Sequence, residues 1–452
     1  MQLQNEEHKS LKVCAGISMT MLALYFADII IMGTGVLTRF GPISARILLF
    51  ALAIAFAIPV MLRRLGRLIR NPYLIAVAAF LLWMAVSAVR GYLAGNPMNV
   101  LKSDVKGYLN YAILPVMLCV LDSEDRIHKM MKVVIASSLL VALASVALSF
   151  FVYYPNAGEI YYFCDHYGLC GITKLYGSAV RIFFHTGSRY FLVAYLFSLY
   201  FCCRESSASK RVMWMGAMTL LLFGIFISYS RGIYASAFLG VIALLMLQFF
   251  APIRDRKKLI VTMLISAGCV LIFIGALSLI QKTNLLAVAL DRVLEIKGLL
   301  GPEQVEAVLE EDMTMEEAFT SGLTRQYELL LLGQSIALSP IIGHGLGKTV
   351  PPYEFVEYSY HDIINKAGII GLILMLVPAF IMIWQLLRGK KRGSGVHSSA
   401  WLLSLSAMVS VGYFLFIAYS NPCMNTTVGI SCCCLCMALV SYYMKRPESQ
   451  SR

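Results

Sequence analysis

Runs of apolar residues, each close to twenty residues long, recur along the whole chain and are separated by polar segments. A helix needs about 20 apolar residues to cross the hydrocarbon core of a bilayer, so each run is predicted to be a transmembrane helix. Twelve spans are predicted, and the expected fold is an all-α, polytopic transmembrane bundle. The approximate spans are 11–33, 43–62, 73–90, 105–121, 132–153, 183–203, 212–229, 233–250, 259–280, 362–384, 400–419 and 427–444.

Composition supports a membrane protein. Hydrophobic residues make up 59% of the chain, charged residues make up 14%, and the mean hydropathy is +0.74, which is outside the range of soluble globular chains. The first run is expected to remain in the membrane rather than to be cleaved as a signal peptide, because many further spans follow it.

The positions of the basic residues predict which side of the bilayer each loop faces. The net charge is +13, yet 23 of the 38 Lys and Arg residues fall in alternate loops of the twelve-span arrangement. By the positive-inside rule these loops and both termini are cytoplasmic. This distribution follows membrane topology, so the bilayer is an expected partner and nucleic acid is not.

The predicted organisation has three parts. Residues 1–280 form nine spans, residues 281–361 form an extracytoplasmic loop with helices, and residues 362–452 form three spans and a cytoplasmic tail. Residues 281–360 hold 12 acidic and 5 basic residues, a net charge of −7.

Two helices are expected within the loop. The first, residues 302–318, is acidic. The second, residues 324–338, presents an apolar face that we expect to lie against the membrane domain. That face consists of Tyr327, Leu330, Leu331 and Leu338.

Arginines at the predicted outer face are the first candidates for chemistry. Arg231 follows a short turn between the seventh and eighth spans, and Arg181 lies with His185 and Arg189 near the start of the sixth. A guanidinium matches the geometry of phosphate oxygens, so an anion site is one interpretation. The other is that these arginines anchor helix ends at the lipid headgroups.

The second candidate region combines Arg325 with the segment Pro340 to Gly347. Arg325 lies in the first turn of the second loop helix, where it either binds an anion or pairs with Glu328. Glycines at three alternate positions allow close backbone approach to a ligand, although such loops are common. His344 lies among these glycines and is a further candidate for substrate binding.

The third candidate region, Tyr360 to Gly371, opens the tenth span. The side chain of His361 can accept a proton near neutral pH, which is what activation of a sugar hydroxyl requires. A single histidine at a membrane interface also fits a structural role. Tyr360 is a candidate for substrate binding.

The twelve cysteines indicate little chemistry. Most fall in predicted spans, including the group between Cys432 and Cys436, where small packing residues are expected rather than metal ligands. Cys164 and Cys170 share an outward loop and either stay reduced or form a disulfide, depending on the compartment.

The order of these motifs resembles the O-antigen ligase and O-antigen polymerase family of bacterial membrane glycosyltransferases. The resemblance consists of a Ser-Arg-Gly turn at Arg231, a loop with Ser-Gly-x-x-Arg ending at Arg325, Pro-x-x-Gly-x-Gly-x-Gly from Pro340, and His361 before a span. One departure is Asp362, where family members commonly have asparagine.

The resemblance implies an activity. Family members take a glycan from undecaprenyl diphosphate at the outer face of the inner membrane, without a metal ion or other cofactor. The acceptor is lipid A-core in ligases and another carrier-linked glycan in polymerases. Arg231 and Arg325 would bind the diphosphate, and His361 would act on the acceptor hydroxyl. Direct attack by the acceptor would invert the anomeric centre.

A ligase is the first expectation and a polymerase the alternative, because the sequence does not separate them. The sugars and the oligomeric state are likewise undetermined. A transporter, such as a flippase for lipid-linked oligosaccharides, would have a similar number of spans. Transporters, however, tend to have repeated halves and polar residues near the midplane, whereas here the unusual polar residues gather at the outer face.

Overall fold

The computed structural model is about 80% helical. It describes residues 2–41, 43–151, 157–174, 180–250, 256–294, 323–391, 398–419 and 421–443. Within these ranges, eight helices are long and apolar enough to cross a membrane. The chain is therefore a helical, multi-pass membrane protein.

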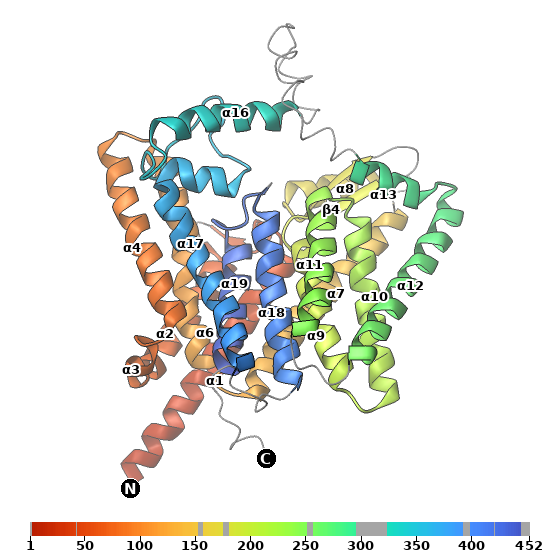
Figure 1. The fold of residues 1–452 in the computed structure, drawn as a ribbon, viewed down its shortest axis with the longest axis horizontal. Coiled ribbons are helices and arrows are strands. Elements are labelled where there is room, and N and C mark those ends of the chain that lie inside the picture. Colours follow the sequence, from red (N-terminus) through yellow and green to blue (C-terminus); the bar gives the residue numbers. More distant parts are fainter. Residues whose placement is uncertain are drawn as a thin grey trace, which may run out of the picture.

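The helices and strands follow one another along the chain, with the labels of Figure 1. The first half comprises α1 (Gln2–Ile31), β1 (Arg39–Phe40), β2 (Ile43–Ser44), α2 (Ala45–Arg63), α3 (Leu65–Leu68), α4 (Pro72–Leu93), α5 (Met98–Leu109), η1 (Asn110–Ala112), α6 (Ile113–Val120), α7 (Glu124–Phe151), α8 (Ala157–His166), β3 (Cys170–Lys174), β4 (Val180–Phe184) and η2 (Gly187–Tyr190). The second half comprises α9 (Phe191–Arg204), α10 (Ala208–Ile227), α11 (Arg231–Phe250), α12 (Arg256–Gln281), α13 (Leu285–Leu294), α16 (Leu323–Leu338), α17 (Ser359–Lys391), α18 (Ser398–Ile417) and α19 (Thr427–Tyr443).

Eight of the twelve predicted spans coincide with the long apolar helices α1, α2, α4, α7, α10, α12, α17 and α18. The other four fall on shorter or interrupted helices. The span predicted at 105–121 is divided between α5, η1 and α6, and the span predicted at 183–203 begins only at Phe191. Residues 183–184 instead belong to β4, which pairs with β3 in an antiparallel hairpin. Two small two-stranded sheets thus interrupt the expected all-α fold.

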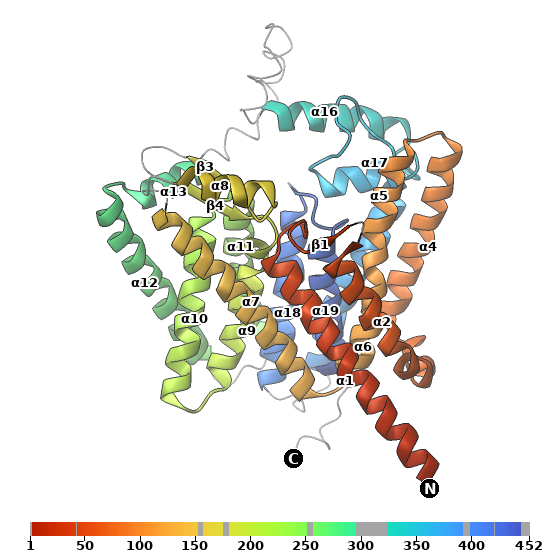
Figure 2. The same ribbon diagram turned by 180° about the vertical axis from the view of Figure 1, so that it is seen from behind.

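The long helices stand roughly side by side, and the connecting elements gather at the two ends of the bundle (Figure 1). Both chain termini lie at one end, which we call the terminal end. The short helices α8, α13 and α16 and the β3–β4 hairpin lie at the opposite end, which we call the loop end. The view from behind shows α1 crossing the bundle and extending beyond it at the terminal end (Figure 2).

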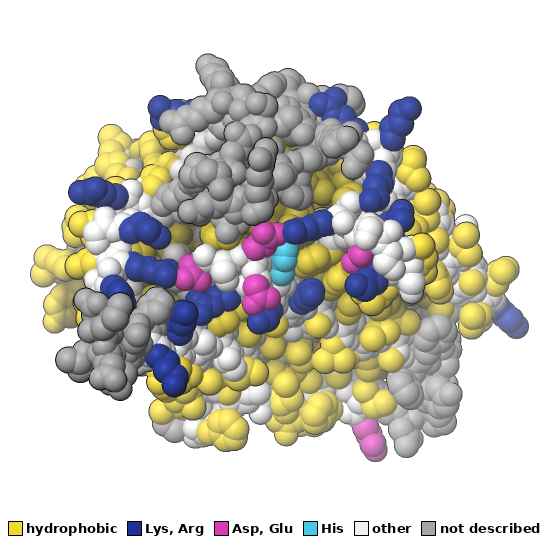
Figure 3. Space-filling model, turned by 90° about the horizontal axis from the view of Figure 1, so that it is seen from below, with side chains coloured by type: hydrophobic (Ala, Val, Ile, Leu, Met, Phe, Trp, Pro, Cys, Tyr) yellow, Lys and Arg dark blue, Asp and Glu magenta, His cyan; other side chains and the backbone are white. Residues whose placement is uncertain are grey.

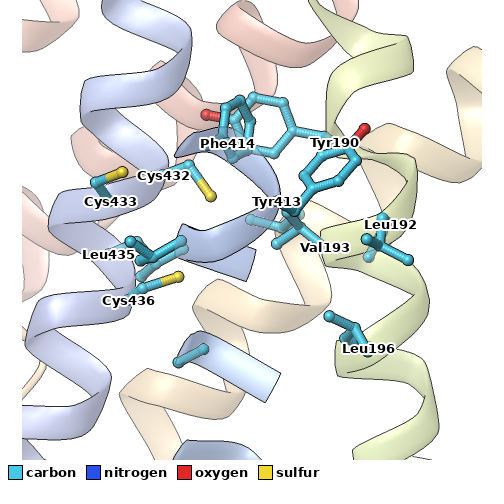
Figure 4. Packing of buried hydrophobic residues seen from close by; sticks show 14 of the residues in the cluster. Tyr190, Leu192, Val193, Leu196, Tyr413, Phe414, Cys432, Cys433, Leu435 and Cys436 are labelled. Carbon is cyan, nitrogen blue, oxygen red and sulfur yellow. The ribbon is translucent and has the colours of Figure 1, made fainter. Parts of the chain in front are cut away.

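The centre of the bundle consists of α9, α18 and α19. Nearly every side chain of α19 is buried, and its run of cysteines packs against Tyr190, Tyr413 and Phe414 (Figure 4). The hydroxyl of Tyr190 donates to the carbonyl of Val428 at 2.8 Å. Small side chains let neighbouring backbones approach closely inside a membrane, which explains the composition of α19. The cysteines from Cys432 to Cys436 are accordingly packing residues.

Lys and Arg side chains gather on the terminal end, as the space-filling view from that side shows (Figure 3). Several belong to ion pairs between connecting segments. Asp122, for example, accepts hydrogen bonds from Arg64 at 2.7 Å and Arg126 at 2.8 Å. The charge pattern read from the sequence therefore corresponds to a basic face in three dimensions.

Helix α16 confirms the second predicted loop helix, but of the four residues of its predicted face only Leu331 is partly buried. Tyr327, Leu330 and Leu338 are exposed, and Leu338 keeps 81% of its surface. Leu332 is buried instead, packed against the segment that follows α16 through Val350, Val356, Tyr358 and neighbouring residues. Most of the apolar stripe thus lies on the side of α16 away from its main contact. The first predicted loop helix, residues 302–318, lies outside the described residues.

Candidate functional site

Helix α17 is broken at Gly368 into a short segment, residues 359–367, and a long segment, residues 369–391. Gly368 has φ of 72°, and a Cβ at this position would overlap the carbonyl oxygen of Ile341. The amide of Ile369 donates to the carbonyl of Pro340 at 2.9 Å rather than along the helix. The left-handed φ and the close approach together require glycine. We call residues 359–367 the His361 segment.

His361 is half-buried in an aromatic setting at the loop end. The rings of Tyr358 and Tyr419 meet the imidazole edge to face, with centroid distances of 5.6 and 6.3 Å. Its buried Nδ1 atom has no hydrogen-bond partner within the described part of the chain. A neutral imidazole with an uncommitted ring nitrogen can accept a proton from a hydroxyl group. The setting of His361 is therefore compatible with a general base.

The candidate Tyr360, in contrast, contacts another helix. Its hydroxyl donates to the backbone carbonyl of Leu415 in α18. Next to it, the amide of Ser359 donates to the carbonyl of Ala418 at 3.2 Å. These bonds fasten the start of the His361 segment to the end of α18, so the hydroxyl of Tyr360 serves helix packing.

A buried ion cluster lies on the other side of the His361 segment. The ammonium of Lys366 lies 2.9 Å from a carboxylate oxygen of Asp362, one helical turn earlier, and 2.9 Å from one of Asp104 in α5. None of the three side chains is more than 7% exposed. The second carboxylate oxygen of Asp104 accepts the amide of Gly347 at 2.8 Å. The cluster therefore joins α5, the glycine segment and the His361 segment.

This cluster gives Asp362 a role that the sequence analysis missed. The carboxylate of Asp362 pairs with Lys366 in the protein interior. Asp104 was not a candidate, because it directly precedes a predicted span. Two signals pointed to the cluster. One is the i, i+4 spacing of Asp362 and Lys366, and the other is an aspartate next to an apolar run, where charges are costly unless paired.

The glycines of the segment 340–347 serve backbone packing. Gly343, Gly345 and Gly347 all have positive φ, and a Cβ on Gly345 would overlap the backbone of Gly91 in α4. The guanidinium of Arg90 donates to the carbonyls of residues 342 and 343, at 2.6 Å each. The glycines thus let this segment pack closely against the backbones of α4, α5 and α17.

His344 takes part in the same packing. Its Nε2 atom lies 2.8 Å from the carbonyl oxygen of Ser335 in α16, and its backbone amide donates to the carbonyl of Asn365 at 2.8 Å. The hydroxyl of Ser335 also donates to the side-chain oxygen of Asn365 at 2.7 Å. His344 therefore holds α16 against the His361 segment.

The turn that precedes Arg231 is tightly constrained. Tyr229 is buried with φ of 42°, a left-handed conformation that costs free energy for a non-glycine residue. Arg231 is the first residue of α11 and is half-buried. The Nε atom of Arg181, in β4, donates to the carbonyl of Ser228 at 3.2 Å. The structure thus brings the candidates Arg181 and Arg231 to one turn, which the sequence did not indicate.

Arg181, His185 and Arg189 follow one another in and just after β4. The guanidinium of Arg181 stacks over the ring of Phe183, with 5.2 Å between the guanidinium carbon and the ring centroid. Burial lowers the pKa of His185, and the neighbouring charges of Arg189 and Arg181 lower it further. His185 is therefore neutral at neutral pH, and the positive charge of this region comes from arginines.

Arg325 lies in the first turn of α16, at the loop end. Its side chain is outside the described part of the structure. The alternative partner suggested by the sequence, Glu328, is 3% exposed, and its carboxylate accepts the amide of Glu357 at 2.6 Å.

An apolar cavity of about 370 Å³ lies between α11, α17 and α18. We call it the α11–α18 groove. Its lining is almost wholly hydrophobic, and α11 contributes to it from Ser236, five residues after Arg231. The lining residues are Ser236, Leu239, Gly240, Ala243, Leu247, Ala379, Ile383, Met408, Val409, Val411, Gly412, Tyr413, Leu415 and Phe416.

The candidates therefore form two groups at the loop end. Arg181 contacts the turn that precedes Arg231 at the start of α11, and His361 lies in the short segment of α17, with Arg325 on α16 apart from both. Leu415 of α18 connects the two groups. It lines the α11–α18 groove, and its carbonyl accepts a hydrogen bond from Tyr360, next to His361. Within the described ranges, no three His, Cys, Asp or Glu side chains gather as a metal site would require.

Comparison with known proteins adds no assignment, since no family model and no curated protein sequence matches the chain.

Proposed function

We propose that this protein is a membrane glycosyltransferase that moves a glycan from undecaprenyl diphosphate to an acceptor at the outer face of a bacterial inner membrane. The first assignment is O-antigen ligase, with lipid A-core as acceptor. The alternative within the same chemistry is a polymerase that uses a second carrier-linked glycan.

The α11–α18 groove is the observation that carries this proposal. A polyprenyl diphosphate combines a long hydrocarbon chain, which cannot leave the bilayer, with a strongly anionic headgroup. The groove supplies an apolar surface within the membrane-spanning helices, and Arg231 precedes its first lining residue by five positions on α11. Apolar lining next to an arginine matches both parts of such a donor.

The arginines supply the electrostatics of the proposed reaction. Departure of the glycan leaves a diphosphate with increased negative charge on its leaving oxygen. Guanidinium groups directed at that charge stabilise the transition state more than the bound donor. Arg181 braces the turn that carries Arg231, and Arg325 is the second proposed ligand of the diphosphate.

His361 is the proposed general base. It would accept the proton of the acceptor hydroxyl as that oxygen attacks the anomeric carbon, and the carbon–oxygen bond to the diphosphate would break on the opposite face. This in-line substitution inverts the anomeric centre. The half-buried imidazole at the loop end, with the rings of Tyr358 and Tyr419 beside it, supports this role.

The proposed reaction also requires a membrane topology. We place the terminal end in the cytoplasm because its Lys and Arg clusters follow the positive-inside rule. The loop end, with residues 281–361, then faces the periplasm. The shorter helices α9, α11 and α19, and α5 with α6, complete twelve crossings.

The lipopolysaccharide pattern of a strain lacking the gene tests the proposal. Complete loss of O-antigen, with carrier-linked polymer accumulating, indicates a ligase. Core that bears one repeat unit indicates a polymerase. A normal pattern that complementation does not alter would contradict both assignments.

Two observations favour transport as the second candidate function. Broken helices and buried charges within the membrane domain are frequent in transporters. Here α17 is broken at Gly368, and the Lys366 cluster is buried. Accumulation of lipid-linked glycan on the cytoplasmic face in the deletion strain would support transport over transfer.

A further inference from the structure

Two cysteines meet beneath the β3–β4 hairpin at the loop end. Cys164 lies near the end of α8 and Cys170 is the first residue of β3, and both are buried, with exposures of 7% and 0%. The chain folds back between them, because the amide of Leu169 donates to the carbonyl of Cys164 at 2.8 Å. Each thiol is the largest influence on the pKa of the other, so the two side chains lie close together, and both are free thiols in the structure. Sequence spacing alone left this pairing open, and the fold brings the sulfur atoms together.

The turn between the two cysteines is fixed from outside. Gly168 has φ of 59°, and a Cβ on it would overlap the side chain of Thr34 in the segment after α1. The amide of Thr34 donates to the carbonyl of Gly168 at 3.2 Å. Thr34 therefore fixes the turn that brings the two cysteines together. A fixed turn favours formation of a bond between the two sulfur atoms.

From these contacts we propose that Cys164 and Cys170 are joined by a disulfide in the mature protein. This inference concerns a covalent modification and does not depend on glycan transfer. It depends on the loop end facing an oxidising compartment, where structural disulfides persist.

The bond would form by thiol–disulfide exchange with an oxidant of the disulfide class. The Cys164 thiolate attacks one sulfur of the oxidant, a mixed disulfide forms, and one oxidant thiolate leaves. The Cys170 thiolate then attacks the sulfur of Cys164 and releases the second oxidant thiolate. The two cysteines lose two protons and two electrons, and the oxidant is reduced to two thiols.

The setting of the pair is compatible with this order of events. The hydrogen bond from Cys170 lowers the pKa of Cys164 to about 7, so Cys164 reaches its thiolate form near neutral pH.

A disulfide here would support the candidate anion site. It would tie α8 to β3, and β3 pairs with β4 so that Thr173 lies opposite Arg181. Arg181 in turn donates to the turn that carries Arg231. The bond would thus stabilise the hairpin that holds Arg181 in place.

Thiol trapping of the full-length protein tests the pairing. Membranes are dissolved in SDS with N-ethylmaleimide, digested with chymotrypsin and examined by mass spectrometry before and after reduction. We expect Cys164 and Cys170 in linked peptides that become alkylated only after reduction. Alkylation of both before reduction would overturn the proposal.

The chain offers a matched internal control. Cys432 and Cys436 also share a thiol hydrogen bond, but they lie one helical turn apart in the bundle core. We expect both to be alkylated without reduction. If they too resist alkylation until reduction, the assay reports general oxidation and the proposal fails.

Two variants sharpen the test. In Cys164→Ser, the Cys170 thiol should become alkylated without reduction, whereas continued resistance would show that Cys170 pairs elsewhere. In Cys164→Ser/Cys170→Ser, the melting temperature in detergent should not respond to dithiothreitol, whereas that of the native protein should fall. A native protein whose melting temperature is unchanged by dithiothreitol would contradict a stabilising bond.

Discussion

The ammonium of Lys366 lies 2.9 Å from a carboxylate oxygen of Asp104, although 262 positions separate the two residues in the chain. Both side chains are buried, and Asp362 completes the cluster. Removing one partner of a buried ion pair leaves an uncompensated charge, which is far more damaging than removing the whole cluster.

We therefore expect Lys366→Met to destabilise the protein by about 3–5 kcal/mol, because it leaves Asp104 and Asp362 without their cation. The triple change Asp104→Asn/Asp362→Asn/Lys366→Met, which removes every charge of the cluster, should recover much of this loss. Thermal unfolding of purified protein in detergent measures both effects. Lys129→Met is the control, because Lys129 also forms an i, i+4 pair with an aspartate but is 67% exposed. Equal loss in the Lys129 and Lys366 variants would contradict the interpretation.

Substitution of Gly368 should disturb the His361 segment. Gly368→Ala places a methyl group against the carbonyl oxygen of Ile341 and forces a left-handed φ on alanine, at a cost of about 1–3 kcal/mol for the backbone alone. Gly268→Ala is the matched control, since a Cβ there meets no atom within 4 Å. Thermal unfolding compares the two variants. A Gly368→Ala protein as stable as Gly268→Ala would show that the break in α17 is not required.

The helices could be predicted from the sequence, whereas most contacts between distant residues could not. Apolar runs located most helices because length and hydropathy are local properties. The partner of Lys366 was not foreseen, since Asp104 approaches it only in the folded chain. The glycines near His344 suggested close approach, but only the fold shows that α4 is what approaches. The buried face of α16 was only partly identified, because the segment that covers it has no periodic pattern.

Substitution of the proposed catalytic residues tests the site. Arg231→Lys keeps the charge and loses the planar fork, so it should impair transfer nearly as much as Arg231→Ala. Loss of one such contact costs about 2–4 kcal/mol, or roughly 30-fold to 1000-fold in rate. Arg325 variants should behave alike, and His361→Ala should abolish transfer while leaving donor binding largely intact.

The assay for these variants is glycan transfer in cells at matched membrane levels. Arg39→Ala is the control, because Arg39 is an exposed arginine in the connection between α1 and α2. His344→Ala is unsuitable as a neutral control, since His344 binds α16. Near-normal transfer by both Arg231→Ala and Arg325→Ala would mean that these arginines only anchor helices.

Chelation provides an independent check on the proposed electrostatics. If arginines rather than a divalent cation stabilise the leaving diphosphate, purified enzyme with carrier-linked donor should keep its activity in EDTA. Activity that disappears in EDTA and returns with Mg²⁺ or Mn²⁺ would rule out the proposed mechanism.

Reporter fusions test the proposed topology. A fusion near residue 310 should be active only outside the cytoplasm, and a fusion near residue 394 only inside. The basic clusters at the terminal end are the reason for this expectation. The reverse pattern at either position would overturn the assigned sides.

The break at Gly368 also affects how strongly the position of His361 depends on the thickness of the bilayer. A membrane helix tilts when the thickness of the surrounding lipid changes. In a continuous α17 that tilt would displace His361. Here the His361 segment is bonded to residues 344 and 345 through the carbonyls of Asn365 and Lys366, and to α18 through Ser359. The position of His361 therefore depends on these bonds to α18 and to residues 344 and 345, and not only on the tilt of the long segment of α17.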